Sequence, residues 1–189
     1  MMKASIRILL FLALAGPIGG DPMPAPAGGR TIPLNMYIII DGSSAFTRRK
    51  DAALAWLCEY AADTLLQEGD AVTVWLAAGQ AQQVFAETIT GQDDKERLKR
   101  VFQALKPAGR TANYSAALQE AAALEAAADR EHIPYTLLVV AGQTSFPVKP
   151  ETAGLLRYSR TQNFTGWRAV VAALGIEGEV RQAAAALMP

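Results

Sequence analysis

The polar residues best placed for binding chemistry follow directly after a long apolar run. Residues 36–40 are Met-Tyr-Ile-Ile-Ile, and the chain then changes at once to Asp41, Gly42, Ser43 and Ser44. The apolar run has no alternation, which is typical of a central parallel strand covered on both faces. In open α/β sheets, ligands bind in the crevice at the carboxyl ends of such strands. We therefore expect Asp41 and the serines after it to lie at a binding edge of the sheet.

Other residues that could support catalysis are few. His132 is the only histidine, and no Gly-x-Ser-x-Gly elbow, phosphate-cradling glycine loop or Cys/His metal spacing is present. A Ser/His/Asp hydrolase would need His132 near Ser43, but the expected topology places the two at opposite ends of the fourth strand. We expect that the protein is not an enzyme; the alternative is a small exported α/β hydrolase or nucleotide-binding protein. A hydrogen bond between His132 and any serine would favour that alternative.

The lone cysteine, Cys58, cannot form an internal disulfide. It lies on an expected helix among aromatic and aliphatic neighbours and has no histidine or basic residue beside it. We interpret it as a buried structural thiol rather than a reactive one.

Hydrophobic periodicity predicts the elements that hold the binding edge in place. Helical spacing predicts a helix over residues 47–67, and residues 71–77 form a second, nearly continuous apolar strand. The short turn at Gly79 permits only an antiparallel return, because a parallel return needs a long crossover. The returning strand, residues 81–89, carries polar side chains as an edge strand would.

The second half of the chain continues to alternate helices and strands. Helices are expected over residues 92–105, 112–130, 151–160 and 177–187, and strands over residues 135–141 and 167–174. Right-handed crossovers then place helices on both faces of one sheet. The sequence therefore predicts an α/β fold with a doubly wound, mostly parallel sheet and one antiparallel edge strand.

The beginning of the chain has the order of an export signal. Lys3 and Arg7 provide positive charge, residues 8–15 form a short apolar core, and Ala13-Leu14-Ala15 fits a small-x-small cleavage site. The apolar run is shorter than the roughly 20 residues that span a bilayer. The alternative is a buried N-terminal helix.

These features divide the chain into three parts. We expect a signal peptide at residues 1–15, a Pro/Gly-rich linker at residues 16–33 and one folded domain at residues 34–189. The mature protein would be exported, either periplasmic or secreted, with no transmembrane span. Because the 18 basic and 18 acidic residues balance and no basic stripe is present, we expect another protein, and no nucleic acid, as the partner.

The order of elements, together with Tyr-Ile-Ile-Ile-Asp-Gly-Ser at residues 37–43, resembles the von Willebrand factor type A (vWA) domain family. Gly109-Arg110-Thr111 before a helix is similar to the family's second loop, and residues 138–142 are similar to its fourth strand. Residues 170–175, followed by a terminal helix, match its last strand and helix. The resemblance extends over residues 34–187 and implies a small, exported, bacterial-type vWA protein.

The resemblance also implies a metal-ion-dependent adhesion site, of which this chain retains only part. The family reads Asp-x-Ser-x-Ser in its first loop, a threonine in its second and an aspartate after its fourth strand. Asp41, Ser43 and Thr111 match three positions, whereas Ala45 and Ala141 occupy two others. Since Mg²⁺ dehydrates reluctantly, one carboxylate and two hydroxyls would hold it weakly. We expect a degenerate site without a cofactor; the alternative is weak Mg²⁺ or Mn²⁺ binding at these three residues.

The same residues have a structural interpretation that remains open. Asp41 and Ser43 favour local hydrogen bonds to the backbone in turns and helix caps. Thr111 could cap the helix that follows it. On sequence alone, the capping interpretation stands beside the ligand interpretation.

Protein binding or scaffolding is the function that this pattern favours. The expected binding rim comprises the loops at residues 41–46, 109–114 and 142–146, and its contact residues are Ser44, Phe46, Tyr114, Gln143, Thr144 and Phe146. Aromatic anchors ringed by polar groups are typical of interface cores. The alternative is that these aromatic side chains pack inward beneath the loops.

Overall fold

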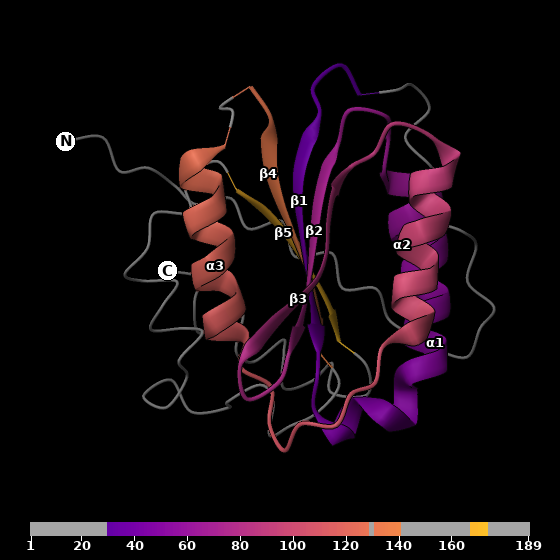
Figure 1. Cartoon of the computed structure of the whole chain (residues 1–189), viewed down its shortest axis with the longest axis vertical. Helices are drawn as coiled ribbons and strands as arrows, with labels where there is room; N and C mark the ends of the chain where they lie inside the picture. The colour runs from indigo at the N-terminus through magenta and orange to yellow at the C-terminus, as the bar shows by residue number, and fades with distance from the viewer. Residues whose placement is uncertain (1–29, 129–130, 141–166, 174–189) are drawn as a thin grey trace.

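The computed structural model describes residues 30–128, 131–140 and 167–173. Within these ranges the chain forms one five-stranded sheet in the order β3-β2-β1-β4-β5 (Figure 1). The strands are β1 (Leu34–Asp41), β2 (Ala71–Ala77), β3 (Ala81–Thr88), β4 (Ile133–Val140) and β5 (Arg168–Ala173). Neighbouring strands are parallel except β2 and β3, which are antiparallel. The predicted α/β fold with one antiparallel edge strand is confirmed.

Strand β1 is the centre of the sheet, as its sequence predicts. All eight of its residues are buried. Met36, Ile38 and Ile40 face the core beneath α1 and α2, whereas Tyr37 and Ile39 face the core beneath α3. Because both faces are covered by helices, neither set of alternate residues needs to be polar. The run of apolar residues therefore follows from the central position of the strand.

One face of the sheet is covered by two helical segments. The first comprises a 3₁₀ helix, η1 (Ser44–Arg49), then α1 (Lys50–Trp56) and a π-helical stretch, η2 (Leu57–Leu65). The second is α2 (Gln92–Ala104), which buries Leu98 and Phe102. Helical spacing correctly predicted where both segments lie. It did not predict that the hydrogen-bond register changes within the first segment. That segment begins at Ser44, three residues before the expected start at residue 47.

Helix α3 (Tyr114–Ala127) lies on the opposite face of the sheet (Figure 1). Ala117 and Ala121 are fully buried, so their small side chains bring this helix close to β1 and β2. The helix begins two residues later than expected, because Asn113 caps it. None of the helices in the described ranges is both long enough and apolar enough to cross a membrane.

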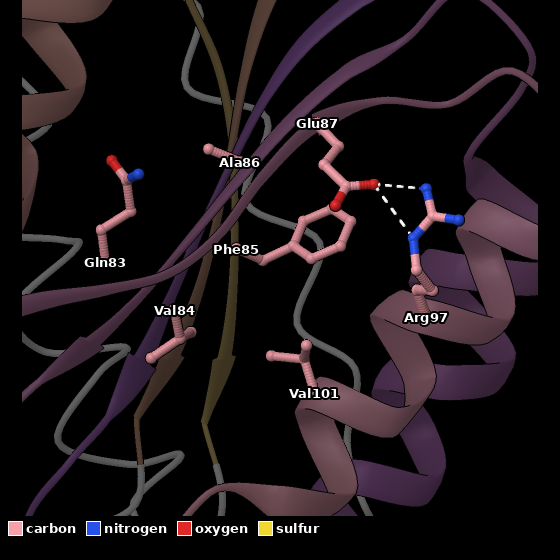
Figure 2. A pocket seen from close by; sticks show the side chains of 7 residues that line it. All are labelled: Gln83, Val84, Phe85, Ala86, Glu87, Arg97 and Val101. Atoms are coloured by element: carbon pink, nitrogen blue, oxygen red, sulfur yellow. Dashed lines mark hydrogen bonds and ion pairs between the residues drawn. The ribbon is translucent and has the colours of Figure 1, made fainter.

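The edge strand β3 packs against α2 beside an open pocket of about 410 Å³ (Figure 2). Arg97 of α2 reaches across to Glu87 of β3 with its Nη2 atom 2.6 Å from Glu87 Oε2. Arg97 also contacts Asp94, which accepts two hydrogen bonds from Thr90. These hydrogen bonds and the neighbouring Arg97 keep the pKa of Asp94 below its usual value. The charged groups of this pocket are thus paired with one another.

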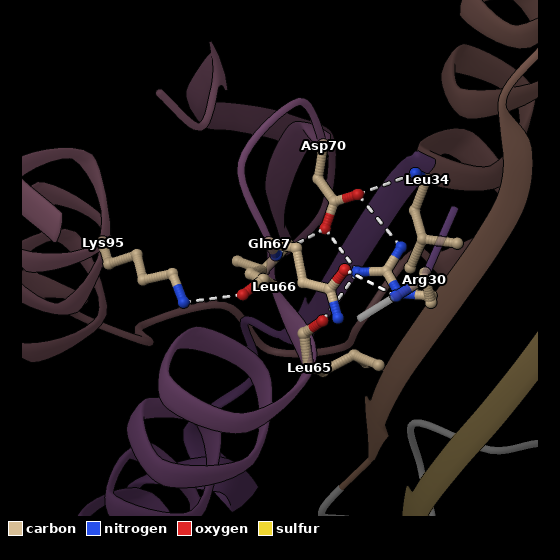
Figure 3. Close-up of polar contacts among 7 residues, drawn as sticks. All are labelled: Arg30, Leu34, Leu65, Leu66, Gln67, Asp70 and Lys95. Atoms are coloured by element: carbon tan, nitrogen blue, oxygen red, sulfur yellow. Dashed lines mark hydrogen bonds and ion pairs between the residues drawn. The ribbon is translucent and has the colours of Figure 1, made fainter. Parts of the chain in front are cut away.

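The amino end of the sheet is held by a buried carboxylate, Asp70 (Figure 3). Arg30 binds it through two hydrogen bonds of 3.0 and 2.6 Å, and the backbone N–H groups of Leu34 and Gln67 each donate to it at 2.8 Å. Arg30 also donates to the carbonyl of Leu65. Although Arg30 lies in the segment predicted as a linker, it is therefore tied into the base of the domain.

Several predicted features lie outside the described residues. They are the signal peptide at residues 1–15, most of the linker, and the helices expected over residues 151–160 and 177–187. These features stay predictions.

Candidate functional site

Three loops meet at the carboxyl end of β1, where the sequence places the binding edge. The N–H of Gly42 donates to the carbonyl of Ala77 at the end of β2, at 2.8 Å. The N–H of Gly109, in the loop between α2 and α3, donates to the carbonyl of Gly42 at 2.9 Å. Ser44 then donates its N–H back to Gly109 at 2.8 Å. We name this end of the molecule the carboxyl rim, comprising residues 41–50, 77–80 and 106–114.

Two glycines allow the loops of the carboxyl rim to approach this closely. A Cβ atom added to Gly42 would lie 2.8 Å from the carbonyl oxygen of Ala77, and one added to Gly109 would lie 3.0 Å from that of Gly42. Both neighbours are backbone atoms, which cannot rotate away as a side chain can. The loops of the rim therefore contact one another directly through their backbone atoms.

Asp41 and Ser43 are both fully buried at the base of the rim. The carboxylate of Asp41 accepts a 2.8 Å hydrogen bond from the N–H of Ser43, two residues further along the chain. This is a local turn of the kind that aspartate favours. The structural interpretation therefore accounts for the role of one oxygen of the Asp41 carboxylate. Ser43 is also the residue before η1, but its side chain makes no capping hydrogen bond.

Thr111 is exposed on the rim, and Asn113 rather than Thr111 caps α3. The side-chain oxygen of Asn113 accepts a 3.1 Å hydrogen bond from the N–H of Ala116. Its amide nitrogen lies 3.3 Å from the carbonyl of Gly79 and so also contacts the turn after β2. The alternative that Thr111 caps this helix is wrong. Asparagine at this spacing before a helix is itself a common capping signal, which could have identified Asn113 from the sequence.

Replacing Asn113 with alanine is expected to lower the free energy of unfolding by about 1 kcal/mol, because the first turn of α3 loses its cap. Thr111→Ala, two residues away and exposed, is expected to change it by less than about 0.5 kcal/mol. Urea unfolding followed by circular dichroism measures both values. Equal losses in the two variants would contradict the assignment of the cap.

The two aromatic residues predicted as partner anchors point into the protein. Phe46 is fully buried in the core beneath α1 and α2, and Tyr114 is 3% exposed in the core beneath α3. This is the inward-packing alternative, and it removes Phe46 and Tyr114 from the described surface of the rim. Ser44 is exposed, as a contact residue would need to be.

The third predicted loop lies outside the described residues. Gln143, Thr144 and Phe146, as well as Ala141 at the position of the missing aspartate, all belong to residues 141–166. The roles proposed for them stay predictions.

His132, the only histidine, lies at the amino end of the sheet, away from Ser43. Its Nδ1 atom is 2.9 Å from the side-chain oxygen of Asn35. Asn35 and the hydroxyl of Tyr37 both donate hydrogen bonds to Glu125 of α3, at 3.0 and 2.7 Å. Burial, followed by the hydrogen bond to Glu125, raises the pKa of Tyr37 above its usual value. In the described part of the chain, His132 thus belongs to a polar cluster that fastens α3 to β1.

Comparison with known proteins identifies the fold by structure. No family model and no curated protein matches the sequence. The structure is similar to a von Willebrand factor type A protein from Catenulispora acidiphila, with a TM-score of 0.61 and 20% identity over 82% of this chain and 37% of that one. It is also similar to the manganese-loaded TRAP protein of Plasmodium vivax, with a TM-score of 0.60 and 18% identity over 76% of this chain and 57% of that one.

A third similar structure is proximal thread matrix protein 1 from the mussel byssus, in a form with zinc in its adhesion motif. Its TM-score is 0.59, with 13% identity over 80% of this chain and 41% of that one. This chain therefore spans well under two thirds of the length of these structures. At such low identities the likeness concerns the fold. The chain has a vWA-type fold.

Proposed function

We propose that this chain is an exported protein-binding or scaffold module of vWA type that binds its partner at the carboxyl rim. The observation that carries the proposal is the convergence of three connections at one end of the sheet, held by the backbone hydrogen bonds of Gly42, Ser44 and Gly109. Binding residues are disproportionately found on loops that a rigid scaffold positions. Ser44, Arg110 and Thr111 are exposed on these loops.

The names of similar proteins fit a module of this class. One is a matrix protein of the mussel byssus, and another is described as a von Willebrand factor type A protein. Export is part of the proposal because residues 1–15 have the charge, apolar core and cleavage pattern of a signal peptide.

The proposed module works without a bound metal. The described residues that match the adhesion-site motif are Asp41, Ser43 and Thr111, and one oxygen of the Asp41 carboxylate already accepts a hydrogen bond from Ser43. The described residues contain no group of three His, Cys, Asp or Glu side chains that could hold a metal ion. Mg²⁺ dehydrates reluctantly, so one carboxylate and two hydroxyls would hold it only weakly. The donor set therefore fits a resident Mg²⁺ or Mn²⁺ poorly.

Binding rather than catalysis is proposed because the potential catalytic groups lie apart. His132 contacts Asn35 at the amino end of β1, while Ser43 follows its carboxyl end. A nucleophile and its base must lie within hydrogen-bond reach of each other.

Adding millimolar Mg²⁺ or Mn²⁺ is expected to change the thermal midpoint of the protein by less than about 1 °C. A site filled to 100 times its Kd would instead add about 2.7 kcal/mol and raise the midpoint by roughly 5–10 °C. Differential scanning fluorimetry with and without EDTA measures the difference. A shift of that larger size would favour a metal-dependent module that uses Asp41, Ser43 and Thr111.

Capture from a native extract tests the binding face. The immobilised wild-type chain is compared with Ser44→Gln/Thr111→Gln, which places two longer neutral side chains on the rim. Gln103→Lys, an exposed change on α2, is the control. We expect the rim variant to retain roughly a tenth of the bound partner, and the control to retain all of it. Equal capture by all three proteins would contradict the proposal.

A further inference from the structure

Charge is distributed unevenly between the two ends of the sheet, although the whole chain is balanced at 18 basic and 18 acidic residues. The carboxyl rim carries four exposed basic side chains, those of Arg48, Arg49, Lys106 and Arg110. Its one described carboxylate, Asp41, is buried, and the nearest exposed acid, Asp51, directly follows the rim in the first turn of α1. The described amino end exposes three acidic side chains, those of Glu68, Asp93 and Glu131, and one basic side chain, that of Arg168 at the start of β5.

The basic side chains of the rim are not used within the described protein. The ion pairs among described residues involve Arg30, Arg97 and Lys99 as the cations. The four exposed basic residues of the rim form no ion pair with a described acidic residue, and neither does the half-buried Lys50. Their positive charge is therefore available to a partner.

Backbone hydrogen bonds bring the segments that carry these charges to one end of the sheet. Arg110 directly follows Gly109, whose carbonyl accepts the hydrogen bond from Ser44 at the start of η1. Arg48 and Arg49 form the last turn of that same short helix, which the fully buried Phe46 anchors to the core. In Figure 1 the loop between α2 and α3 crosses the same end of the sheet. The three arginines thus flank one hydrogen-bonded junction.

We propose that the carboxyl rim recognises a carboxylate-rich segment of a partner protein through Arg48, Arg49 and Arg110. The guanidinium group is planar and always charged, and it binds a carboxylate through two parallel hydrogen bonds. A patch of one sign also speeds the encounter with a partner of the opposite sign. This inference rests on the proposed function, because it names the chemistry of the partner that the same rim binds.

An acidic protein suits this surface better than a nucleic acid does. Single-stranded nucleic acids are held by aromatic side chains that stack on bases, but Phe46 and Tyr114 are buried. Proteins that bind the phosphate backbone are usually strongly basic, whereas this sequence has a pI of about 6.6.

Fluorescence anisotropy of the full chain with labelled peptides tests the inference. The probe is a short peptide of alternating glutamate and serine, and the matched peptide carries glutamine in place of glutamate. We expect the glutamate peptide to bind about tenfold more tightly at low salt, and the difference to shrink at high salt because the charges are exposed.

Matched charge reversals locate the binding site. Arg48→Glu/Arg110→Glu is expected to weaken binding of the glutamate peptide about tenfold. Arg100→Glu/Arg168→Glu changes the net charge equally at two exposed residues outside the rim and is expected to leave binding unchanged. The thermal midpoint of each variant is measured first. If a reversed variant unfolds, Arg48→Gln/Arg110→Gln and Arg100→Gln/Arg168→Gln replace the two pairs.

Four outcomes would overturn the inference. The first two are equal binding of both peptides and equal losses of binding in the two variant pairs. The third is tighter binding of a short DNA duplex than of the glutamate peptide. The fourth is salt-sensitive self-association that Arg48→Glu/Arg110→Glu abolishes. The last would identify the acidic end of a second copy as the occupant. Capture from the native extract distinguishes failure of the charge-recognition inference from failure of the proposed function. A partner lost in Ser44→Gln/Thr111→Gln but retained in Arg48→Glu/Arg110→Glu would support rim binding and refute charge recognition.

Discussion

Replacing Asp70 with alanine is expected to lower the free energy of unfolding by about 3–5 kcal/mol, the cost of removing one partner from a buried ion pair. The Asp70 side chain is 1% exposed, and its two oxygens accept four hydrogen bonds, two from Arg30 and one each from Leu34 and Gln67. The alanine variant would leave two backbone N–H groups without this acceptor. It would also leave the Arg30 guanidinium, 19% exposed, without its counter-charge.

The effect extends beyond one contact, because Asp70 joins three segments. Leu34 begins β1, Gln67 lies just after η2, and Arg30 precedes the first strand. The substitution therefore loosens the start of the central strand and the turn that leads into β2.

Urea unfolding monitored by tryptophan fluorescence measures the loss. Glu68→Ala, an exposed acid two residues away, is the control and is expected to change the free energy of unfolding by less than about 0.5 kcal/mol. If Asp70→Ala costs less than about 1 kcal/mol, the Arg30 contact does not hold the base of the domain.

The fold was predictable because its signals are local. A continuous apolar run defines β1, and the three-residue connection between β2 and β3 excludes a parallel return. The pairing of Arg30 with Asp70 has no such signal, since the residues are 40 positions apart and each resembles an ordinary surface charge in the sequence. The π-helical stretch was missed for a related reason. Hydrophobic spacing identifies a helix, but it does not specify the register of its backbone hydrogen bonds.

The place where the loops meet was predictable from the sequence, and the orientation of their side chains was less so. Strand ends and the short loop before α3 correctly placed Gly42, Ser44 and Gly109 at one rim. The orientation of Phe46 and Tyr114 was not predictable, because an aromatic residue beside a polar loop can face either way. In this fold both side chains belong to the adjoining cores, and burying an aromatic ring is strongly favourable.

Gly42→Ala is expected to lower the free energy of unfolding by about 1–3 kcal/mol, since it forces a methyl group into closely packed backbone. The added carbon would lie 2.8 Å from the oxygen and 2.9 Å from the carbon of the Ala77 carbonyl, and 2.9 Å from the nitrogen of Ala78. Relief requires that the loops after β1 and β2 move apart, which weakens the hydrogen bond from Gly42 to Ala77. Because Gly109 is hydrogen-bonded to Gly42, partner capture at the rim should fall as well.

Gly79→Ala is the matched control on the same rim. An added Cβ at Gly79 meets nothing within 4 Å, and the backbone there is not left-handed, so this change should be neutral or stabilise by up to about 1 kcal/mol. Chemical unfolding and partner capture are measured on both variants. If Gly42→Ala lowers the free energy of unfolding no more than Gly79→Ala does, the loops can accommodate the added methyl group. The close backbone contact would then not determine the geometry of the rim. If Gly42→Ala alone loses both stability and capture, the geometry of the rim depends on the one residue type that lets β1 and β2 end side by side.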